Sequence, residues 1–300
     1  MLSFITEKQT VWETLKAEAR PIFIYGMGDG AEKIMRVFRE MNIPLAGIFA
    51  SDDFVRGHSF AGYKVRKLSE IEEQIDDFVI VLAFAAGYQS LVDKLLDIAE
   101  RHTLLVPDVP VAGSGLFTYE YCLEHADEIQ QVYDMLADPF SQKVYANIIN
   151  FKISGKIPYL MEVTTPKDDI YRNIIKLTQN ETYVDLGAYN GDSIRDLRQY
   201  APRLRDVIAF EPDRRNFRKL TEYATALREA GDTLTVHPVQ AGAWSHTATL
   251  TFHGSGNRNA GLTDTPAEAR GSILPSTADN PYFGKTAEVP VTALDTVAED

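Results

Sequence analysis

The sequence predicts an α/β protein built from two doubly wound domains that helices join. Short apolar runs alternate with amphipathic helical segments in both halves of the chain, and this alternation is typical of parallel sheets with right-handed crossovers. A glycine-rich turn follows an apolar run at residues 26–31 and again at residues 187–191. The length of 300 residues is too large for one ordinary core and suits two domains.

The first domain is expected to alternate strands with helices. The predicted strands are Pro21–Tyr25, Leu45–Ala50, Phe78–Phe84 and Thr103–Val106. The predicted helical segments are Val11–Ala19, Glu32–Met41, a helix entered at Val65–Leu68, and Gln89–Arg101. Ser69 and Glu72 have the spacing of a capping box for the third of these helices.

A helical connector is expected between the two domains. Residues 118–150 repeat apolar positions at steps of three and four. Asp138-Pro139 breaks this run into two helices, because the residue before a proline avoids the α region. The stretch Val109–Gly115 carries proline and glycine without periodicity and ends the first domain. We therefore predict a Rossmann-like domain at 1–112, a helical connector at 113–170 and a second Rossmann-like domain at 171–300.

The composition excludes several classes of protein. The chain is 45% hydrophobic and 24% charged, which is a globular composition. Its formal net charge of −13 disfavours a nucleic-acid partner, because phosphate binding needs clustered Lys and Arg. Basic residues do gather between Arg203 and Lys219, and we interpret them as a solvated face. The apolar run Phe78–Gly87 is too short to span a bilayer, so it is expected to be a buried strand.

The single cysteine, Cys122, excludes an internal disulfide and fits a reducing compartment. We expect its thiol to fill core space. The N-terminus has no basic start followed by a long apolar stretch, so no signal peptide is expected. These features predict a cytoplasmic protein without a membrane segment, and they leave the oligomeric state open.

The first glycine turn, Gly26-x-Gly28-x-x-Ala31, matches the dinucleotide fingerprint, which permits alanine at its third place. Asp52 or Asp53 follows at the end of the second predicted strand, where an acid can bind a ribose. Three interpretations of this turn stay open: NAD binding, nucleotide-sugar binding, and a structural or recognition role. The segment resembles the N-terminal domains of sugar acyltransferases, which hold a nucleotide sugar.

The second glycine turn has different spacing and predicts a different ligand. It reads Asp185-x-Gly187-x-x-x-Gly191 and follows a buried strand. The next apolar run ends at Glu211, whose carboxylate can accept hydrogen bonds from both hydroxyls of a ribose. The turn departs from the spacing that cradles a pyrophosphate. It therefore indicates a ligand with a ribose and no phosphate, of which S-adenosylmethionine is the commonest.

Four segments of the second half resemble, in the right order, the FkbM family of S-adenosylmethionine-dependent methyltransferases. The likeness covers roughly residues 140–300. The segments are Val184–Ser193, Ala209–Asp213, Val239–Trp244 and Val289–Asp295, the last similar to the family's V-P-V-T-T-L-D.

The resemblance implies a class I methyltransferase fold with S-adenosylmethionine as its cofactor. The family continues past its Leu-Asp segment with a fourth strand, so the domain is expected to be cut short at its C-terminus. The implied donor-binding residues lie after the first, second and third strands. They are Asp185, Gly187, Ala188, Tyr189, Gly191, Asp192, Ser193, Glu211, Pro212 and Ala241.

The leading hypothesis is therefore a methyltransferase that methylates a hydroxyl of a small molecule or glycan. The alternatives are an NAD-dependent oxidoreductase or a nucleotide-sugar-binding module that uses the first glycine turn. A hydroxyl acceptor needs a base, and none of His237, His246 and His253 is assigned that role. His237 lies in a predicted strand and is expected to pack or cap. No metal site is expected.

A long loop, Gly254–Gly284, is predicted between the strands Ala248–His253 and Glu288–Thr292. Its amides, arginine and aromatic residues suit contact with a hydroxyl-rich acceptor. Loops of this length are uncommon in compact domains and often act as lids. A gating lid over the acceptor and a plain surface excursion are the two interpretations.

Overall fold

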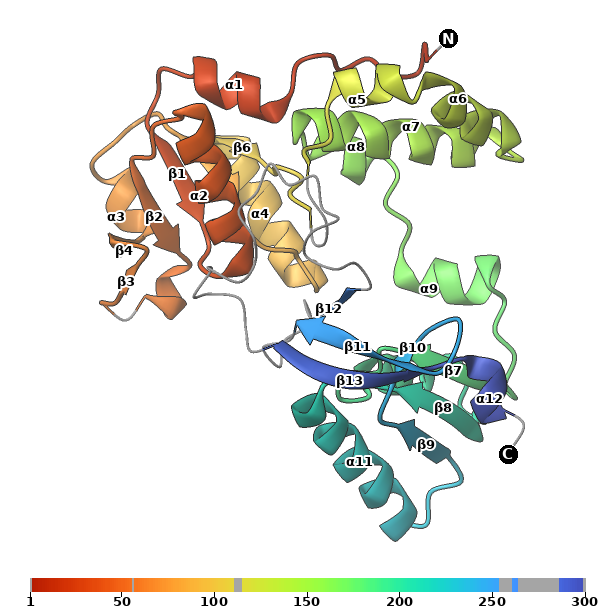
Figure 1. Cartoon of the computed structure of the whole chain (residues 1–300). Helices are drawn as coiled ribbons and strands as arrows, with labels where there is room; N and C mark the ends of the chain where they lie inside the picture. Colours follow the sequence, from red (N-terminus) through yellow and green to blue (C-terminus); the bar gives the residue numbers. More distant parts are fainter. Residues whose placement is uncertain (1, 56, 111–114, 254–260, 264–285, 299–300) are drawn as a thin grey trace. The chain divides into compact units, whose positions relative to one another are not determined.

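The computed structural model describes residues 2–55, 57–110, 115–253, 261–263 and 286–298. The chain divides into two compact units, Met1–Thr164 and Thr165–Asp300, and Figure 1 labels most of their elements. The finer limits proposed from the sequence, with a separate connector at 113–170, stay a prediction. Among the described residues, no helix combines the length and the apolar character needed to cross a bilayer.

The first unit contains a mostly parallel sheet with the order β3-β4-β2-β1-β5-β6. Its neighbours are parallel except for the antiparallel pair β3 and β4. Strand order therefore reverses at β1 and β5, which is the feature of a doubly wound sheet that creates a crevice at the carboxyl ends of the strands. The strands are β1 (Ile22–Tyr25), β2 (Gly47–Ala50), β3 (Ser59–Phe60), β4 (Tyr63–Lys67), β5 (Val79–Leu82) and β6 (Thr103–Leu105).

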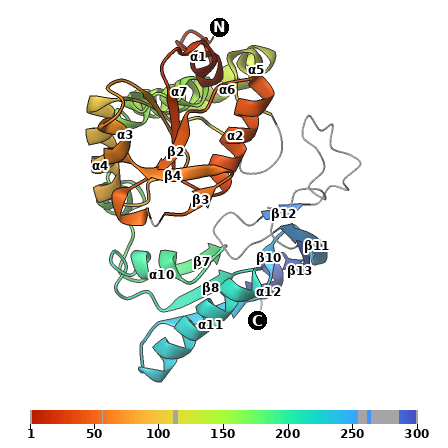
Figure 2. The ribbon, with the colours of Figure 1, turned by 90° about the vertical axis from the view of Figure 1, so that its left-hand side faces the viewer.

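Apolar residues on both faces of the strands explain why helices cover the sheet on both sides. Alternate residues of a strand point to opposite faces, so Ile22 and Ile24 join one core cluster while Phe23 and Tyr25 join the other. Figure 2 shows α2 on one face and α3 and α4 on the other. The helices are α1 (Val11–Ala17), α2 (Asp29–Met41), α3 (Leu68–Glu72) and α4 (Gln89–Arg101); a short 3-10 turn spans Asp52–Phe54.

Four helices that follow the sheet also belong to the first unit. Asp138 begins α7 by accepting a hydrogen bond from the Ser141 backbone at 2.9 Å, as the proline break predicts. The region before α7 is itself divided at His125 into two helices, α5 and α6. Cys122 is fully buried, which confirms its expected place in the core. The helices are α5 (Tyr119–Glu124), α6 (Ala126–Met135), α7 (Pro139–Ser154) and α8 (Pro158–Met161).

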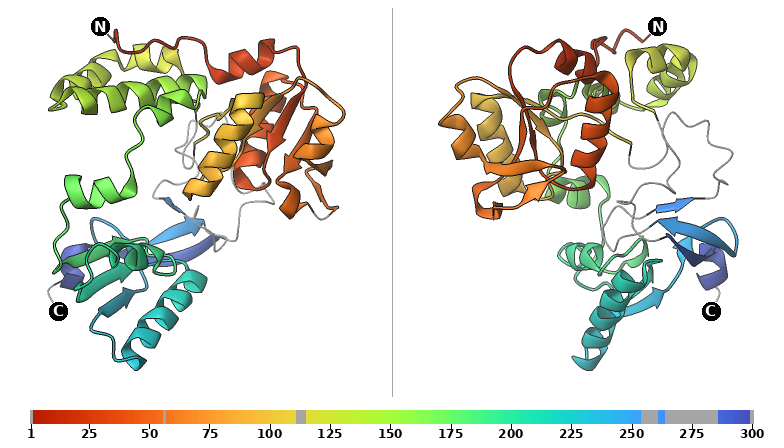
Figure 3. Two further views of the ribbon diagram at one scale, coloured as in Figure 1. Left: turned by 180° about the vertical axis from the view of Figure 1, so that it is seen from behind. Right: turned by 60° about the vertical axis from the view of Figure 1, so that its left-hand side comes forward.

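The second unit contains a three-stranded parallel sheet in the order β7-β8-β9. One face of this sheet packs on α10 and α11 through a cluster that includes Val207, Ala209 and Leu220. Figure 3 shows α11 as the long cyan helix along the sheet. The elements are α9 (Lys167–Asp169), a π-helical turn (Ile170–Ile174), β7 (Thr182–Leu186), α10 (Asp192–Leu197), β8 (Asp206–Phe210), α11 (Arg214–Glu229) and β9 (Thr235–Val239).

A second sheet in this unit has the order β10-β13-β11-β12. The strands predicted at 248–253 and 288–292 are present, and they form the antiparallel pair β11 and β13. A short strand at Gly261–Thr263 falls inside the segment predicted as a loop, and the rest of Gly254–Gly284 lies outside the described residues. The elements are β10 (Gly242–Ala243), β11 (Ala248–His253), β12 (Gly261–Thr263), β13 (Thr286–Thr292) and α12 (Leu294–Ala298).

Two local expectations for the first unit need correction. The helix expected to be entered at Val65–Leu68 is present as α3 but begins at Leu68, because Val65 is buried and pairs with β2 in strand β4. The capping box expected from Ser69 and Glu72 is absent because Ser69 lies within α3. The Ser69 hydroxyl instead donates to Asp52 Oδ2 at 2.8 Å, and Glu72 accepts from His102 at 2.9 Å.

Gly30, next to the third fingerprint position Ala31, allows helix α2 to approach the end of β5 closely. A Cβ on Gly30 would lie 2.3 Å from the carbonyl oxygen of Ala83, at the end of β5. Alanine normally stabilises a helix interior relative to glycine, but here it would force backbone apart. We expect Gly30→Ala to lower the free energy of unfolding by about 1–3 kcal/mol, the cost of overpacking.

The measurement is urea denaturation followed by Trp12 fluorescence in a Trp244→Phe background, since Trp12 is buried in the first unit. Gly87→Ala is the matched control because no atom lies within 4 Å of the place that its new methyl group would take. That variant should stay within about 0.5 kcal/mol of the parent. Equal stability of the two variants would contradict the close approach.

Candidate functional site

The turn after β7 contains three residues in the left-handed region of φ, two of them glycines. Gly187, Tyr189 and Gly191 have φ values of +114°, +49° and +81°. A Cβ on Gly191 would lie 2.7 Å from Cδ1 of Tyr223 on α11, so this position needs glycine for space as well as for φ. No atom lies within 4 Å of the corresponding point on Gly187, which leaves that part of the backbone open to a ligand.

Hydrogen bonds hold this turn against the end of β8. The backbone N–H groups of Gly187 and Ala188 both donate to the carbonyl oxygen of Phe210, at 2.9 and 2.8 Å. The Gly191 N–H closes the turn on the carbonyl of Ala188 at 2.7 Å. The turn is therefore fixed by the neighbouring strand as well as by its own residues.

Glu211 joins the two turns that end β7 and β8. Its carboxylate accepts the Tyr189 N–H on Oε2 and the Asp213 N–H on Oε1, both at 2.8 Å. The residue is only 5% exposed. Burial raises the pKa of this carboxyl, and the two backbone N–H groups lower it and so favour its charged form. Each oxygen keeps a further lone pair with which to accept a hydrogen bond.

Asp185 is buried without a full set of partners. It lies at the end of β7 with 6% of its surface exposed, and its Oδ2 atom has no hydrogen-bond partner among the described residues. Burial, followed by the nearby charge of Asp192, raises the pKa of Asp185 to about 6, while a hydrogen bond with the Tyr183 side chain acts in the opposite direction. A buried carboxylate with a strongly perturbed pKa is characteristic of ligand sites.

The other predicted site residues lie around these two acids. Asp192 is in the first turn of α10 and close enough to affect Asp185. Ala241 donates its N–H to the Val239 carbonyl at 2.9 Å, the same acceptor that the Glu211 N–H uses at 3.0 Å. Pro212 follows Glu211 and is half-buried, and Ser193 is exposed on α10. The structure thus brings the ends of β7, β8 and β9 to one edge of the sheet.

Three side chains at this edge were missed by sequence reasoning. Tyr183 contacts Asp185, and Tyr223 fills the space beside Gly191. Lys219 places its ammonium 5.2 Å from the ring centre of Tyr189, an arrangement suited to a cation–π contact. Lys219 and Tyr223 are four residues apart on α11, so they share a helix face. The four-residue spacing of Lys219 and Tyr223 was the sequence signal that could have placed both of them beside the glycine turn.

The remaining basic residues of α11 agree with the solvated face expected for the cluster. Arg214, Arg215 and Arg218 are exposed, and Arg218 forms an ion pair with Glu222 at 3.6 Å.

The histidines do not form a catalytic arrangement in the described residues. The expectation that His237 packs or caps is wrong: its side chain is exposed on β9, with Nε2 3.7 Å from Asp206 Oδ1. His246 Nδ1 lies 3.0 Å from Ser245 Oγ, and the side chain of His253 is outside the described part. Within that part, no group of His, Cys, Asp and Glu could hold a metal ion.

The first glycine turn has the backbone of a nucleotide-binding turn but an unfavourable charge. Gly26 and Gly28 have φ values of +118° and +133°. Asp29 opens α2 and pairs with Lys33 at 2.9 Å. Glu32 lies in the same helical turn, and burial followed by the charge of Asp29 raises its pKa. Acidic groups at this helix end oppose an anionic ligand, which the helix dipole would otherwise attract.

The fold and these contacts define a Rossmann-like α/β class, with a glycine turn after one strand and an acid after the next. No family model matches the chain, and no curated protein matches it. A solved structure that it resembles is the methyltransferase FkbM from Methylobacillus flagellatus KT, with a TM-score of 0.58 and 17% sequence identity. The match covers 96% of this chain and 72% of that one, and it shows a shared fold.

Asp185 is expected to destabilise the folded chain at neutral pH. Its folded pKa of about 6 lies above the ordinary aspartate value of 3.8. As pH rises from about 4 to about 6, the unfolded chain therefore loses this proton before the folded chain does. Stability falls across that window and the full penalty of about 3 kcal/mol is present above it. Asp185→Asn removes the penalty.

The test compares Asp185→Asn with the parent in urea, followed by Trp244 fluorescence in a Trp12→Phe background. The stability difference in favour of the variant should be about 2 kcal/mol larger at about pH 7.5 than at about pH 4.5. Asp206→Asn, at the far end of the neighbouring strand β8, is the control. It removes a carboxylate that lies 3.7 Å from His237 Nε2, so it should be no more stable than the parent at either pH. A pH-independent difference for Asp185→Asn would contradict the raised pKa.

Proposed function

We propose that this protein is an S-adenosylmethionine-dependent methyltransferase. The single observation that carries the proposal is the edge formed by the ends of β7, β8 and β9, where Asp185 keeps an unpartnered oxygen and Glu211 keeps free lone pairs. The fold shared with a methyltransferase supports it. When bound, S-adenosylmethionine supplies an electrophilic methyl group on a sulfonium.

The residues present fit this donor in both hydrogen bonding and charge. Glu211 would accept hydrogen bonds from the ribose hydroxyls, because its oxygens are held in place by backbone N–H groups. The unpartnered Oδ2 of Asp185 would accept from the donor's ammonium group. Asp192 and Asp213 add negative charge nearby. Four carboxylates favour a cationic ligand and oppose the phosphates of a dinucleotide.

The open backbone at Gly187 gives the donor a place to lie against the turn. The remaining residues that we propose to contact the donor are Ala188, Tyr189, Gly191, Asp192, Ser193, Pro212 and Ala241. Ala241 would lie beside the adenine, because its backbone sits next to that of Glu211 at the end of β9.

The acceptor we propose is a hydroxyl group of a small molecule or glycan. Much of the rate of methyl transfer comes from aligning the acceptor oxygen with the methyl group, so a site that orients the acceptor matters more than a strong base. The predicted loop Gly254–Gly284, interpreted as either a lid or a surface excursion, lies outside the described residues except for β12. Its part in acceptor binding stays a prediction.

The decisive measurement is isothermal titration of the protein with S-adenosylhomocysteine, which keeps the ribose and the ammonium group. We expect saturable binding. Glu211→Gln should weaken it by about 1.5–3 kcal/mol, roughly 10- to 150-fold, because a charge-assisted acceptor becomes a neutral one.

Asp206→Asn is again the matched control, since it removes one negative charge at the opposite end of the strand that Glu211 follows. It should leave the affinity unchanged. Circular dichroism establishes that each variant is folded. No heat from folded protein at high micromolar ligand would overturn the proposed function, and an unchanged affinity of Glu211→Gln would remove Glu211 from the site.

An NAD-dependent oxidoreductase is the second candidate, favoured by the reversal of strand order at β1 and β5. We expect no saturable NADH signal, because Asp29 and Glu32 put negative charge where a pyrophosphate would meet α2. The measurement is a fluorescence titration of nicotinamide emission. A saturable enhancement that Gly28→Val abolishes would instead establish dinucleotide binding at the first turn.

A further inference from the structure

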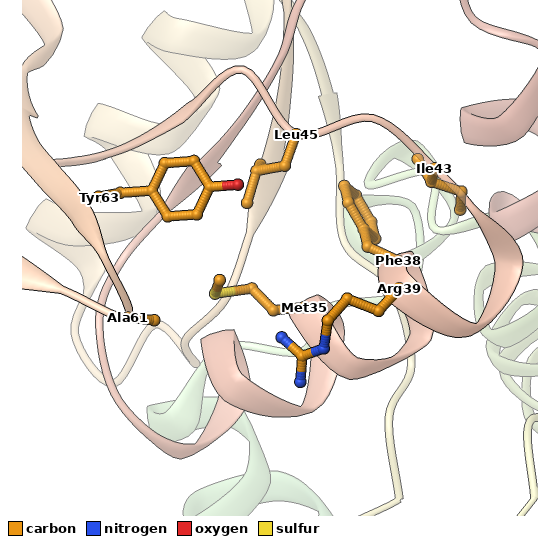
Figure 4. A pocket seen from close by; sticks show the side chains of 7 residues that line it. All are labelled: Met35, Phe38, Arg39, Ile43, Leu45, Ala61 and Tyr63. Atoms are coloured by element: carbon orange, nitrogen blue, oxygen red, sulfur yellow. The ribbon is translucent and has the colours of Figure 1, made fainter.

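A cavity in the first unit lies away from both glycine turns. It has a volume of about 310 Å³ and is bordered by α2, the connection to β2 and the turn between β3 and β4 (Figure 4). Leu45 precedes β2 and Tyr63 begins β4, so the cavity is at the amino ends of these strands. Ligands of doubly wound sheets usually bind at the carboxyl ends, and this cavity is therefore a separate feature.

Five of the seven residues that line the cavity are apolar, and Arg39 and Tyr63 add polar surface to its walls. Met35 and Phe38 belong to the core, with 5% and 2% of their surfaces exposed. Leu45 and Tyr63 are half-buried and face them across the cavity (Figure 4). A thioether and two aromatic rings around one space favour an aromatic ligand. The volume is at the lower end for small-molecule sites, which suits one ring with a short side chain.

Two polar groups at the cavity have no partner among the described residues. The Arg39 guanidinium forms no ion pair or hydrogen bond there, and neither does the Tyr63 hydroxyl. Arg20 binds Glu18 and Asp77, and Arg101 binds Glu72. Arg36 on the same helix forms no such bond in the described residues, but only Arg39, which is exposed, lines the cavity. Figure 4 shows the Arg39 guanidinium turned toward the space between Met35 and Ala61.

We propose that this cavity binds a small aromatic carboxylate. The ring lies among Met35, Phe38 and Tyr63, and the carboxylate binds Arg39. A guanidinium presents two parallel N–H donors that match the two oxygens of a carboxylate, and no carboxylate of the described chain takes that place. The Tyr63 hydroxyl supplies one further hydrogen bond. This site is independent of the methyl-donor site, which is in the other unit.

The test is isothermal titration of the full chain with 3-phenylpropionate and with its neutral analogue 3-phenylpropanamide. The carboxylate should bind at least tenfold more tightly than the amide, because only the carboxylate forms a charge-assisted pair with Arg39. Arg39→Gln should reduce carboxylate affinity to that of the amide. Arg36→Gln, on the same helix but outside the cavity lining, is the matched control and should change neither affinity.

A second variant tests the apolar part of the site. Leu45→Trp places an indole ring in the cavity and should abolish binding of both probes. The affinity for S-adenosylhomocysteine and the circular dichroism spectrum should stay unchanged. The proposal is overturned if folded protein binds neither probe at millimolar concentration. It is also overturned if the two probes bind equally, or if Arg39→Gln or Leu45→Trp binds 3-phenylpropionate as the parent does.

Discussion

The candidate site of the second unit depends on one buried carboxylate that accepts two backbone hydrogen bonds. Glu211 takes an N–H from the turn after β7 and another from the turn after β8. Without it, two N–H groups near the sheet edge would need other acceptors, because unpaired buried backbone groups are costly. The Gly187 and Ala188 bonds to Phe210 act on the same turn, so both turns are set in place together.

The two glycine turns have similar sequence patterns, but the acids that accompany them lie in different environments. In the first unit, the acid that follows β2, Asp52, is exposed and accepts the Ser69 hydroxyl on Oδ2. In the second unit, Asp185 is buried with an oxygen left unpartnered. Natural proteins accept such destabilising groups mainly where a ligand will use them. The contrast favours the second turn as the one that binds.

Much of the fold could be predicted from the sequence, because buried parallel strands read as apolar runs and Pro or Gly separates them. Strand β4 could not, since Tyr63–Lys67 has one buried residue and its pairing with β2 is a long-range contact. Most residues of the candidate site are neighbours in one motif, so the sequence alone could group them. Lys219 and Tyr223 were not, because the rotation of α11 decides which of its faces meets the turn.

The packing of Gly191 against Tyr223 has a consequence for how this sequence can change over time. A side chain at 191 meets both a left-handed backbone and an aromatic ring on α11. Shrinking Tyr223 would remove the second obstacle and leave the first, and it would also leave Arg195 without the ring over which it stacks at 4.8 Å. A substitution at either position is therefore rarely neutral by itself. We expect Gly191 and Tyr223 to covary among related sequences.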